Sequence, residues 1–257
     1  MRYRCTSPTA EESVSEILPR VAGWLTPAQA AILSELASHI PVGTHIVEFG
    51  SFLGRSTLSL LSGASEDVTL YAVDPYAGDE VGPRPGRTAH SGVDPETTHL
   101  EFHKNLGLAG AEGRVTHLRI RSEQTPDDVL EGAGLVFVDG SHRFRDAAQD
   151  LRRVCGRLTP GGWLAVHDAF YSVGVTLAIT TVLLRRPDFT YRGRSGSLAV
   201  YRRTGRGPDG GGARPSRGNR LRQVAELPTL GGVCVRKTGL LIAAACSAGD
   251  IDARWPH

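Results

Sequence analysis

Five short apolar runs, spaced along the first two thirds of this 257-residue chain, constrain its fold more than any other feature. They are HIVEFG (45–50), VTLYAVD (68–74), VTHLRI (115–120), LVFVDG (135–140) and GWLAVHD (162–168). Such runs are almost continuously apolar, and helical or loop segments separate them, which is typical of a parallel sheet covered by helices on both faces. The stretch 189–203 reads as two further strands about a glycine-containing turn. The sequence therefore predicts an α/β fold closed by an antiparallel hairpin.

Helical segments flank these runs. Residues 25–40 have Thr26 as a candidate N-cap and Pro27 at the first helical position, and residues 142–158 carry apolar side chains along one side. We predict an N-terminal helical region (1–39), a central domain (40–203) and a Gly/Arg-rich C-terminal tail (204–257) that is disordered.

Composition narrows the classes of function. The formal net charge of +2 argues against a dedicated nucleic-acid binder. The four cysteines are scattered without a C-x-x-C pair, and the N-terminus lacks the apolar core of a signal peptide, so we expect a cytoplasmic protein. The longest apolar run, near the C-terminus, is too short to span a bilayer, so no membrane association is expected.

The segment VEFGSFLGRST after the first run predicts a ligand cradle. Gly50 and Gly54 allow a tight turn and a close approach of the backbone, and Ser56 or Thr57 would cap the next helix. The spacing matches neither a dinucleotide fingerprint nor a phosphate-binding loop, so the ligand should lack a pyrophosphate. Asp74, which ends the second run, could accept hydrogen bonds from ribose hydroxyls. The alternatives are an ordinary glycine-rich turn and a turn-forming role for Asp74.

Acidic residues and histidines follow the fourth and fifth runs. Asp139, His142, His167 and Asp168 should meet at one edge of the sheet, where such ligands suit a divalent metal. His142 is the candidate general base, because the ordinary pKa of histidine lies near neutrality. The alternatives are Asp139 as a helix cap and His167 as a hydrogen-bonded core histidine.

The segments VEFGSFLGRST, YAVDPY, LVFVDGSH and LTPGGWLAVHD, in this order and with the final hairpin, resemble the motifs of class I S-adenosylmethionine (SAM)-dependent methyltransferases. The resemblance covers about 40–203. It implies a Rossmann-like seven-stranded sheet of order 3-2-1-4-5-7-6, with strand 7 antiparallel and helices on both faces. It also implies a set of cofactor-binding residues: Glu48, Gly50, Ser51, Gly54, Ser56, Thr57, Asp74, Ser122 and Asp139.

The nearest subgroup resembles metal-dependent O-methyltransferases that act on sugars of macrolide antibiotics, with catechol-type enzymes more distant. That likeness implies a metal at Asp139, His167 and Asp168, and catalytic roles for Asp139 and His142. The chain departs from the subgroup at His167, where an acid is usual. Imidazole favours Mn²⁺ over Mg²⁺, so the metal and its necessity stay open.

We therefore expect a SAM-dependent enzyme that methylates a hydroxyl of a small molecule with metal assistance, in natural-product tailoring. A metal-independent N- or C-methyltransferase and a non-catalytic Rossmann-like binding module are the alternatives. The loop 75–99 is interpreted as a lid over the site. Because this class often pairs through N-terminal helices, a homo-oligomer is an open alternative to a monomer.

Overall fold

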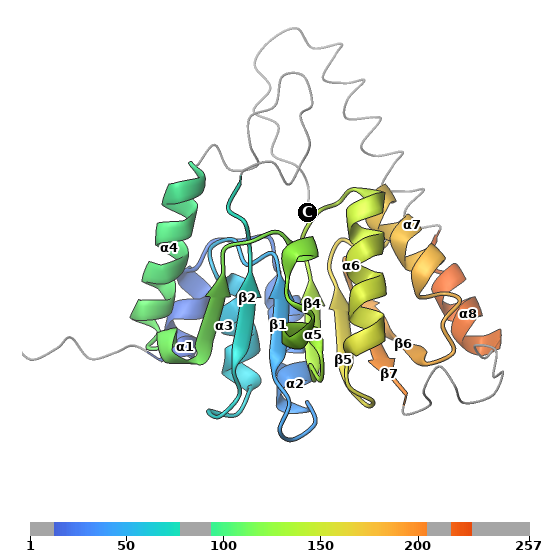
Figure 1. Ribbon diagram of the computed structural model, residues 1–257, viewed down its shortest axis with the longest axis horizontal. Coiled ribbons are helices and arrows are strands. Elements are labelled where there is room, and N and C mark those ends of the chain that lie inside the picture. The colour runs from blue at the N-terminus through green and yellow to red at the C-terminus, as the bar shows by residue number, and fades with distance from the viewer. Residues whose placement is uncertain (1–12, 78–93, 205–216, 228–257) are drawn as a thin grey trace, which may run out of the picture.

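The computed structural model describes residues 13–77, 94–204 and 217–227 (Figure 1). Its centre is a seven-stranded sheet of order β3-β2-β1-β4-β5-β7-β6. The first five strands run parallel, and β7 pairs antiparallel with both β5 and β6. This confirms the predicted strand order and hairpin. The strands are β1 (Ile46–Phe49), β2 (Leu70–Val73), β3 (Val115–Leu118), β4 (Leu135–Val138), β5 (Trp163–Val166), β6 (Phe189–Ser195) and β7 (Leu198–Arg203).

Helices connect the strands and flank the sheet. The α-helices are α1 (Val14–Ile17), α2 (Pro27–Ser38), α3 (Arg55–Gly63), α4 (Pro95–Leu108), α5 (Asp127–Leu130), α6 (Phe144–Arg157), α7 (Val173–Val182) and α8 (Arg217–Val224). Short 3₁₀ turns are η1 (Leu18–Arg20), η2 (Glu112–Arg114) and η3 (Ser122–Gln124). As predicted, Thr26 caps α2 by accepting a hydrogen bond from the backbone of Gln29, with Pro27 in the first helical position.

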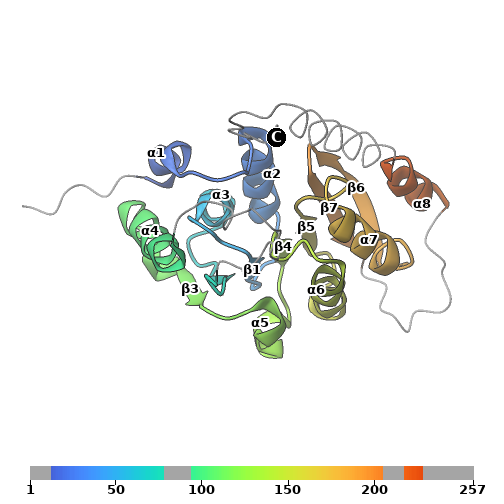
Figure 2. The ribbon, with the colours of Figure 1, turned by 90° about the horizontal axis from the view of Figure 1, so that it is seen from above.

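The core has two layers because successive side chains of a strand point to opposite faces. On β4, Leu135 and Phe137 pack with α2, α3 and α4, whereas Val136 and Val138 pack with α6 and α7. Figure 2 shows α2 and α3 on one side of the sheet and α5 and α6 on the other. Every residue of β1 and β4 is buried, as expected for central strands covered on both faces.

Two segments differ from the predictions. The predicted loop 75–99 ends earlier, because Asp94 caps α4 and its side chain accepts from the backbone of Thr97. Residues 78–93, the greater part of the predicted lid, lie outside the described residues. Within the predicted disordered tail, residues 217–224 form α8. The rest of that tail, apart from Thr204 and the turn after α8, also lies outside the described residues.

Helix α8 packs against β6, which is the edge strand of the sheet. The side-chain amide of Asn219 accepts a hydrogen bond from the Tyr191 backbone at 2.8 Å and donates one to the Phe189 carbonyl at 3.0 Å. Backbone groups at a sheet edge otherwise remain open for pairing with another chain. This part of the tail is therefore fixed to the edge strand of the sheet by hydrogen bonds. Among the described helices, none has the length and apolar character needed to cross a membrane.

Candidate active site

The candidate site lies at the carboxyl edge of the parallel strands, where ligands bind in open α/β sheets. Strained backbone gathers there. In the described part of the chain, the non-glycine residues with positive φ are Phe52, Tyr76, Asp168 and Phe170. They follow β1, β2 and β5, and such conformations persist where the surrounding structure enforces them, often at binding sites.

The turn after β1 approaches the neighbouring strand closely. Gly50 has φ +87°, and a Cβ at this position would lie 2.2 Å from the carbonyl oxygen of Asp139. Gly54, with φ +89°, is the N-cap of α3, so the expectation that Ser56 or Thr57 caps this helix is wrong. Both lie inside its first turn instead. Glycine is needed at position 50 because no side chain fits between the ends of β1 and β4.

Glu48 is fully buried on β1, beneath this turn. Its Oε2 accepts hydrogen bonds from Ser51 at 2.8 Å and from Thr57 at 2.5 Å. Its other oxygen, Oε1, has no hydrogen-bond partner among the described residues. Burial raises the pKa of Glu48 to about 7, although the hydrogen bonds from Thr57 and Ser51 oppose the shift. An unpartnered buried carboxylate oxygen beside a glycine turn suits a ligand that donates hydrogen bonds.

Asp74 closes the turn from β2. Its Oδ2 accepts from the backbone nitrogens of Ser51 and Phe52, at 2.9 and 3.0 Å, and its Oδ1 accepts from that of Tyr76 at 2.8 Å. The carboxylate is 2% exposed. The structure thus joins Glu48, Gly50, Ser51 and Asp74 in one cradle, whose loop Asp74 orders through three backbone hydrogen bonds.

A second group of side chains follows β4 and β5. Donor atoms of Asp139, His142 and Asp168 all lie within 4.8 Å of one another. His142 Nε2 lies 2.8 Å from Asp168 Oδ2. Because the Asp139 backbone borders Gly50, this group adjoins the cradle. The predicted convergence of these residues is therefore observed.

His167, which follows β5, is hydrogen-bonded through both nitrogens of its ring. Its Nδ1 contacts Asp139 Oδ1 at 3.1 Å, and its Nε2 contacts the Ser197 hydroxyl at 3.2 Å. Gln29 of α2 donates to the same hydroxyl at 3.1 Å. Both ring nitrogens are therefore engaged, as in the alternative of a hydrogen-bonded core histidine, and the third residue of the converging group is His142. His167 thus links Asp139 to Ser197.

The carboxylates of Asp139 and Asp168 raise the pKa of both histidines. Burial alone would lower the pKa of His167, but the charge and hydrogen bond of Asp139, with the charge of Asp168, raise it to about 9. Burial likewise opposes protonation of His142, whose pKa is nevertheless raised by its hydrogen bond and ion pair with Asp168. The two carboxylates therefore favour the protonated forms of both histidines.

Ser122 opens the 3₁₀ turn after β3, and its carbonyl accepts from Arg153 Nη1 at 2.6 Å. Its side chain interacts with Asp150 of α6. Asp150 is 1% exposed, and its Oδ2 lacks a hydrogen-bond partner among the described residues. Burial raises the pKa of Asp150 to about 7. The sequence analysis missed this residue, whose signal is an acid within the apolar stripe Ala147-x-x-x-Leu151-x-x-Val154.

Comparison with known proteins identifies the class. Residues 47–169 match a family model described as a methyltransferase domain. With the observed strand order, the match shows that the chain contains a methyltransferase domain of the class I fold, which confirms the resemblance and the fold predicted from the motifs. A curated protein of Mycobacterium sp. (strain JLS), named "Putative O-methyltransferase", is 33% identical over 153 residues. The match covers 58% of this chain and 58% of that protein, so the chain spans about three fifths of this relative.

Solved structures share the fold at low sequence identity. An O-methyltransferase from Bacillus cereus in complex with SAH superposes with a TM-score of 0.53 at 15% identity, covering 74% of this chain and 90% of that one. The O-methyltransferase TomG from Streptomyces achromogenes, involved in tomaymycin synthesis and in complex with SAM, gives a TM-score of 0.52 at 18% identity. That match covers 77% of this chain and 92% of TomG.

Proposed function

We propose that the protein is a SAM-dependent O-methyltransferase that transfers a methyl group to a hydroxyl of a small molecule. The observation that carries the proposal is the joining of the Glu48–Gly50–Asp74 cradle to the Asp139–His142–Asp168 group through the close contact between Gly50 and Asp139. The methyltransferase match and the O-methyltransferase relative support it.

We assign the parts of SAM to the cradle in order along the sheet edge. Asp74 would bind the ribose hydroxyls, and the glycine turn with Ser51, Gly54, Ser56 and Thr57 would enclose the methionine part. Glu48 Oε1 would accept from the ligand's ammonium group, because it is buried without a partner among the described residues. Ser122 and the neighbouring Asp150 would face the adenine, whose amino group could donate to the free Asp150 oxygen.

The transfer is a displacement at the sulfonium methyl group. The acceptor oxygen forms a bond to the methyl carbon while the carbon–sulfur bond breaks, and the bonding electron pair remains on sulfur. The acceptor's proton would go to His142 Nδ1, since Nε2 faces Asp168 at 2.8 Å. Asp168 then stabilises the imidazolium, and His167 holds Asp139 in place.

A divalent metal fits the same group, since Asp139 and Asp168 offer two carboxylates and Mg²⁺ is commonly held by one or two carboxylates plus waters. A bound cation would supply positive charge that lowers the pKa of an adjacent hydroxyl. Mn²⁺ would bind there as well, because it also accepts carboxylate and water ligands. We further propose a cytoplasmic location, a tailoring role in natural-product synthesis, and no nucleic-acid partner.

Calorimetric titration of SAM into the full chain tests the proposal, together with SAH release over a panel of hydroxylated small molecules with and without EDTA. We expect binding to be lost in Asp74→Ala and kept in Asp67→Ala, an exposed acid at the opposite edge. Gly50→Val should also lose it. His142→Gln should bind SAM yet release no SAH. Absence of SAM binding in the wild type would contradict the proposal that SAM is the cofactor. A product methylated on nitrogen or carbon would contradict the proposal that a hydroxyl is the acceptor.

A further inference from the structure

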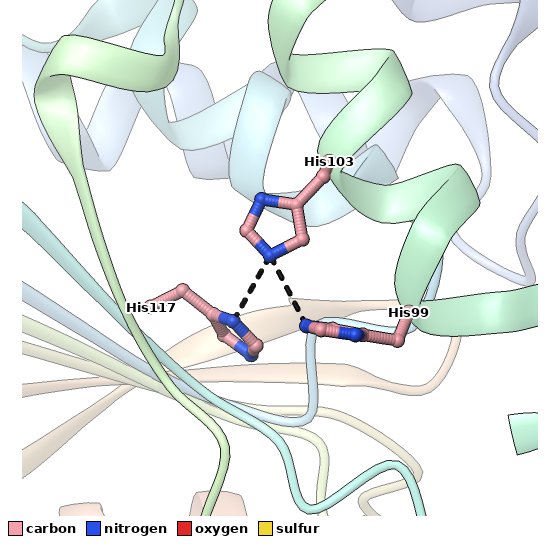
Figure 3. A group of neighbouring side chains, drawn as sticks. All are labelled: His99, His103 and His117. Carbon is pink, nitrogen blue, oxygen red and sulfur yellow. Dashed lines mark hydrogen bonds between the residues drawn. The ribbon is translucent and has the colours of Figure 1, made fainter. Parts of the chain in front are cut away.

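Three histidines form a second cluster of possible metal ligands on other elements of the fold. His99 and His103 lie one turn apart on α4, and His117 lies on the edge strand β3. Figure 3 shows their ring nitrogens pointing toward one another. One nitrogen of each ring lies within 4.8 Å of the other two. None of the three belongs to the candidate active site.

The distances suit a zinc-type ion. His103 Nε2 lies 3.1 Å from His99 Nε2 and 3.2 Å from His117 Nδ1. Nitrogens bound to Zn²⁺ at 2.0–2.1 Å in tetrahedral geometry lie about 3.3 Å apart. These two distances are therefore already close to the spacing of such a ligand set, and the third lies within 4.8 Å. Histidines four residues apart on one helix face are also a recurrent way of holding zinc.

Hydrogen bonds among the three rings cannot satisfy all of the ring nitrogens that face one another. Each nitrogen of a neutral imidazole carries either one proton or one lone pair. His103 Nε2 faces two other ring nitrogens, so it can form one good hydrogen bond but not two. A cation placed between the rings would use a lone pair from each of the three.

The side chains around the cluster are consistent with this use. His99 Nδ1 lies 3.5 Å from Glu96 Oε1, an arrangement in which a carboxylate can orient a metal-binding histidine. Arg119 Nη1 also approaches His99 Nδ1, at 3.3 Å, but its guanidinium is paired with Glu96 at 2.6 Å. Metal binding through His99 Nε2 would place the proton on Nδ1, directed to Glu96.

We infer that His99, His103 and His117 bind one divalent transition-metal ion of the zinc type, which fastens α4 to the edge strand β3. The fourth position would be taken by water. The inference does not depend on methyl transfer, and the site's role is structural.

The neutral state that a metal requires is favoured here. Burial, followed by the charges of His103 and His99, lowers the pKa of His117 to about 4. Burial also lowers the pKa of His103, helped by His99. Both shifts are in the direction of the neutral ring, whose lone pair a metal ion needs.

The cluster also adjoins the cofactor cradle. The Tyr76 ring lies 5.0 Å from that of His99 and 5.5 Å from that of His117. The Tyr76 backbone donates to Asp74, and its hydroxyl donates to the Phe52 carbonyl. Fixing α4 and β3 would therefore support Tyr76 and, through it, the loop that Asp74 orders.

The test is titration of Co²⁺, and then competing Zn²⁺, into the chelator-treated full chain. Visible absorption reports tetrahedral Co²⁺, and thermal unfolding is followed in parallel. All measurements use an Asp139→Asn background, which separates this site from the candidate active site. We expect one equivalent of tetrahedral Co²⁺, its displacement by Zn²⁺ and a higher Tm with metal.

His103→Gln and His117→Gln should each weaken binding by more than the roughly 10- to 100-fold typical of losing an outer partner of a ligand. Glu96→Gln should weaken it within that range. His45→Gln is the matched control. His45 is also a half-buried histidine beside a tyrosine ring, but it directly precedes β1 and is not part of the cluster. Unaltered Co²⁺ spectra and affinity in His103→Gln and His117→Gln, or no tetrahedral Co²⁺ in the background protein, would overturn the inference.

Discussion

Glu48 is an ionisable residue in a fully buried position. This single residue should make the free energy of unfolding depend on pH. Its pKa in the folded chain, about 7, lies above the ordinary 4.5 because of burial. Its contribution to stability is therefore complete below pH 4.5 and is lost as the pH rises to about 7. We expect Glu48→Gln to be more stable than the wild type at pH 8 by up to about 3 kcal/mol, since one pKa unit corresponds to about 1.4 kcal/mol.

Urea unfolding of the metal- and cofactor-free protein between pH 4.5 and 8 measures this effect. The wild type should lose stability across the window, and Glu48→Gln should lose less, with the remaining slope due in part to Asp150. Glu35→Gln, which removes an exposed carboxylate of α2, is the control. Parallel pH profiles for the wild type and Glu48→Gln would contradict the buried, proton-binding state of Glu48.

At the scale of elements, the packing of α2 on α3 depends on one small residue. A Cβ on Gly63, the last residue of α3, would lie 1.8 Å from the backbone oxygen of Ser34 on α2. Gly63→Ala would therefore force the helices apart, and we expect a loss of about 1–3 kcal/mol, as for an overpacked core. Gly156 lies in α6 with nothing within 4 Å of such a Cβ, so Gly156→Ala should gain about 0.5–1 kcal/mol from helix propensity. Chemical denaturation of both variants should show opposite signs, and equal effects would refute the packing argument.

The elements also differ in how well the sequence predicts them. The strand order, the Thr26 cap and the meeting of Asp139 with Asp168 were predictable, because strand patterns and strand-end residues act locally. Helix α4 was not predicted, because a Gly/Pro-rich stretch precedes its start at Asp94 and Pro95. The pairing of His99 with His103 on that helix was therefore not predicted either. The third ligand, His117, is distant in sequence and comes close only through tertiary packing. The contact of His167 with Ser197 likewise joins residues distant in sequence, and no local pattern encodes it.

At the scale of the whole molecule, α8 closes a sheet that would otherwise end in an open strand. Asn219 bonds the outward-facing backbone of β6, and Glu226 adds contacts to the Tyr191 hydroxyl and to Arg194. Composition indicates a disordered tail here because the stabilising partner, β6, lies outside the segment itself. A segment of low apolar content can still be ordered when it completes another element's hydrogen bonds.

Removing that closure should weaken the fold and promote association. Asn219→Ala leaves two edge backbone groups without their amide partner, so we expect a loss of about 1–3 kcal/mol in unfolding free energy. The exposed edge should also increase concentration-dependent light scattering, because open strands pair with other chains. Arg220→Ala, which alters an exposed neighbour on the same helix, is the matched control and should behave as the wild type. If Asn219→Ala unfolds and scatters like Arg220→Ala, α8 is not the element that protects the edge of β6.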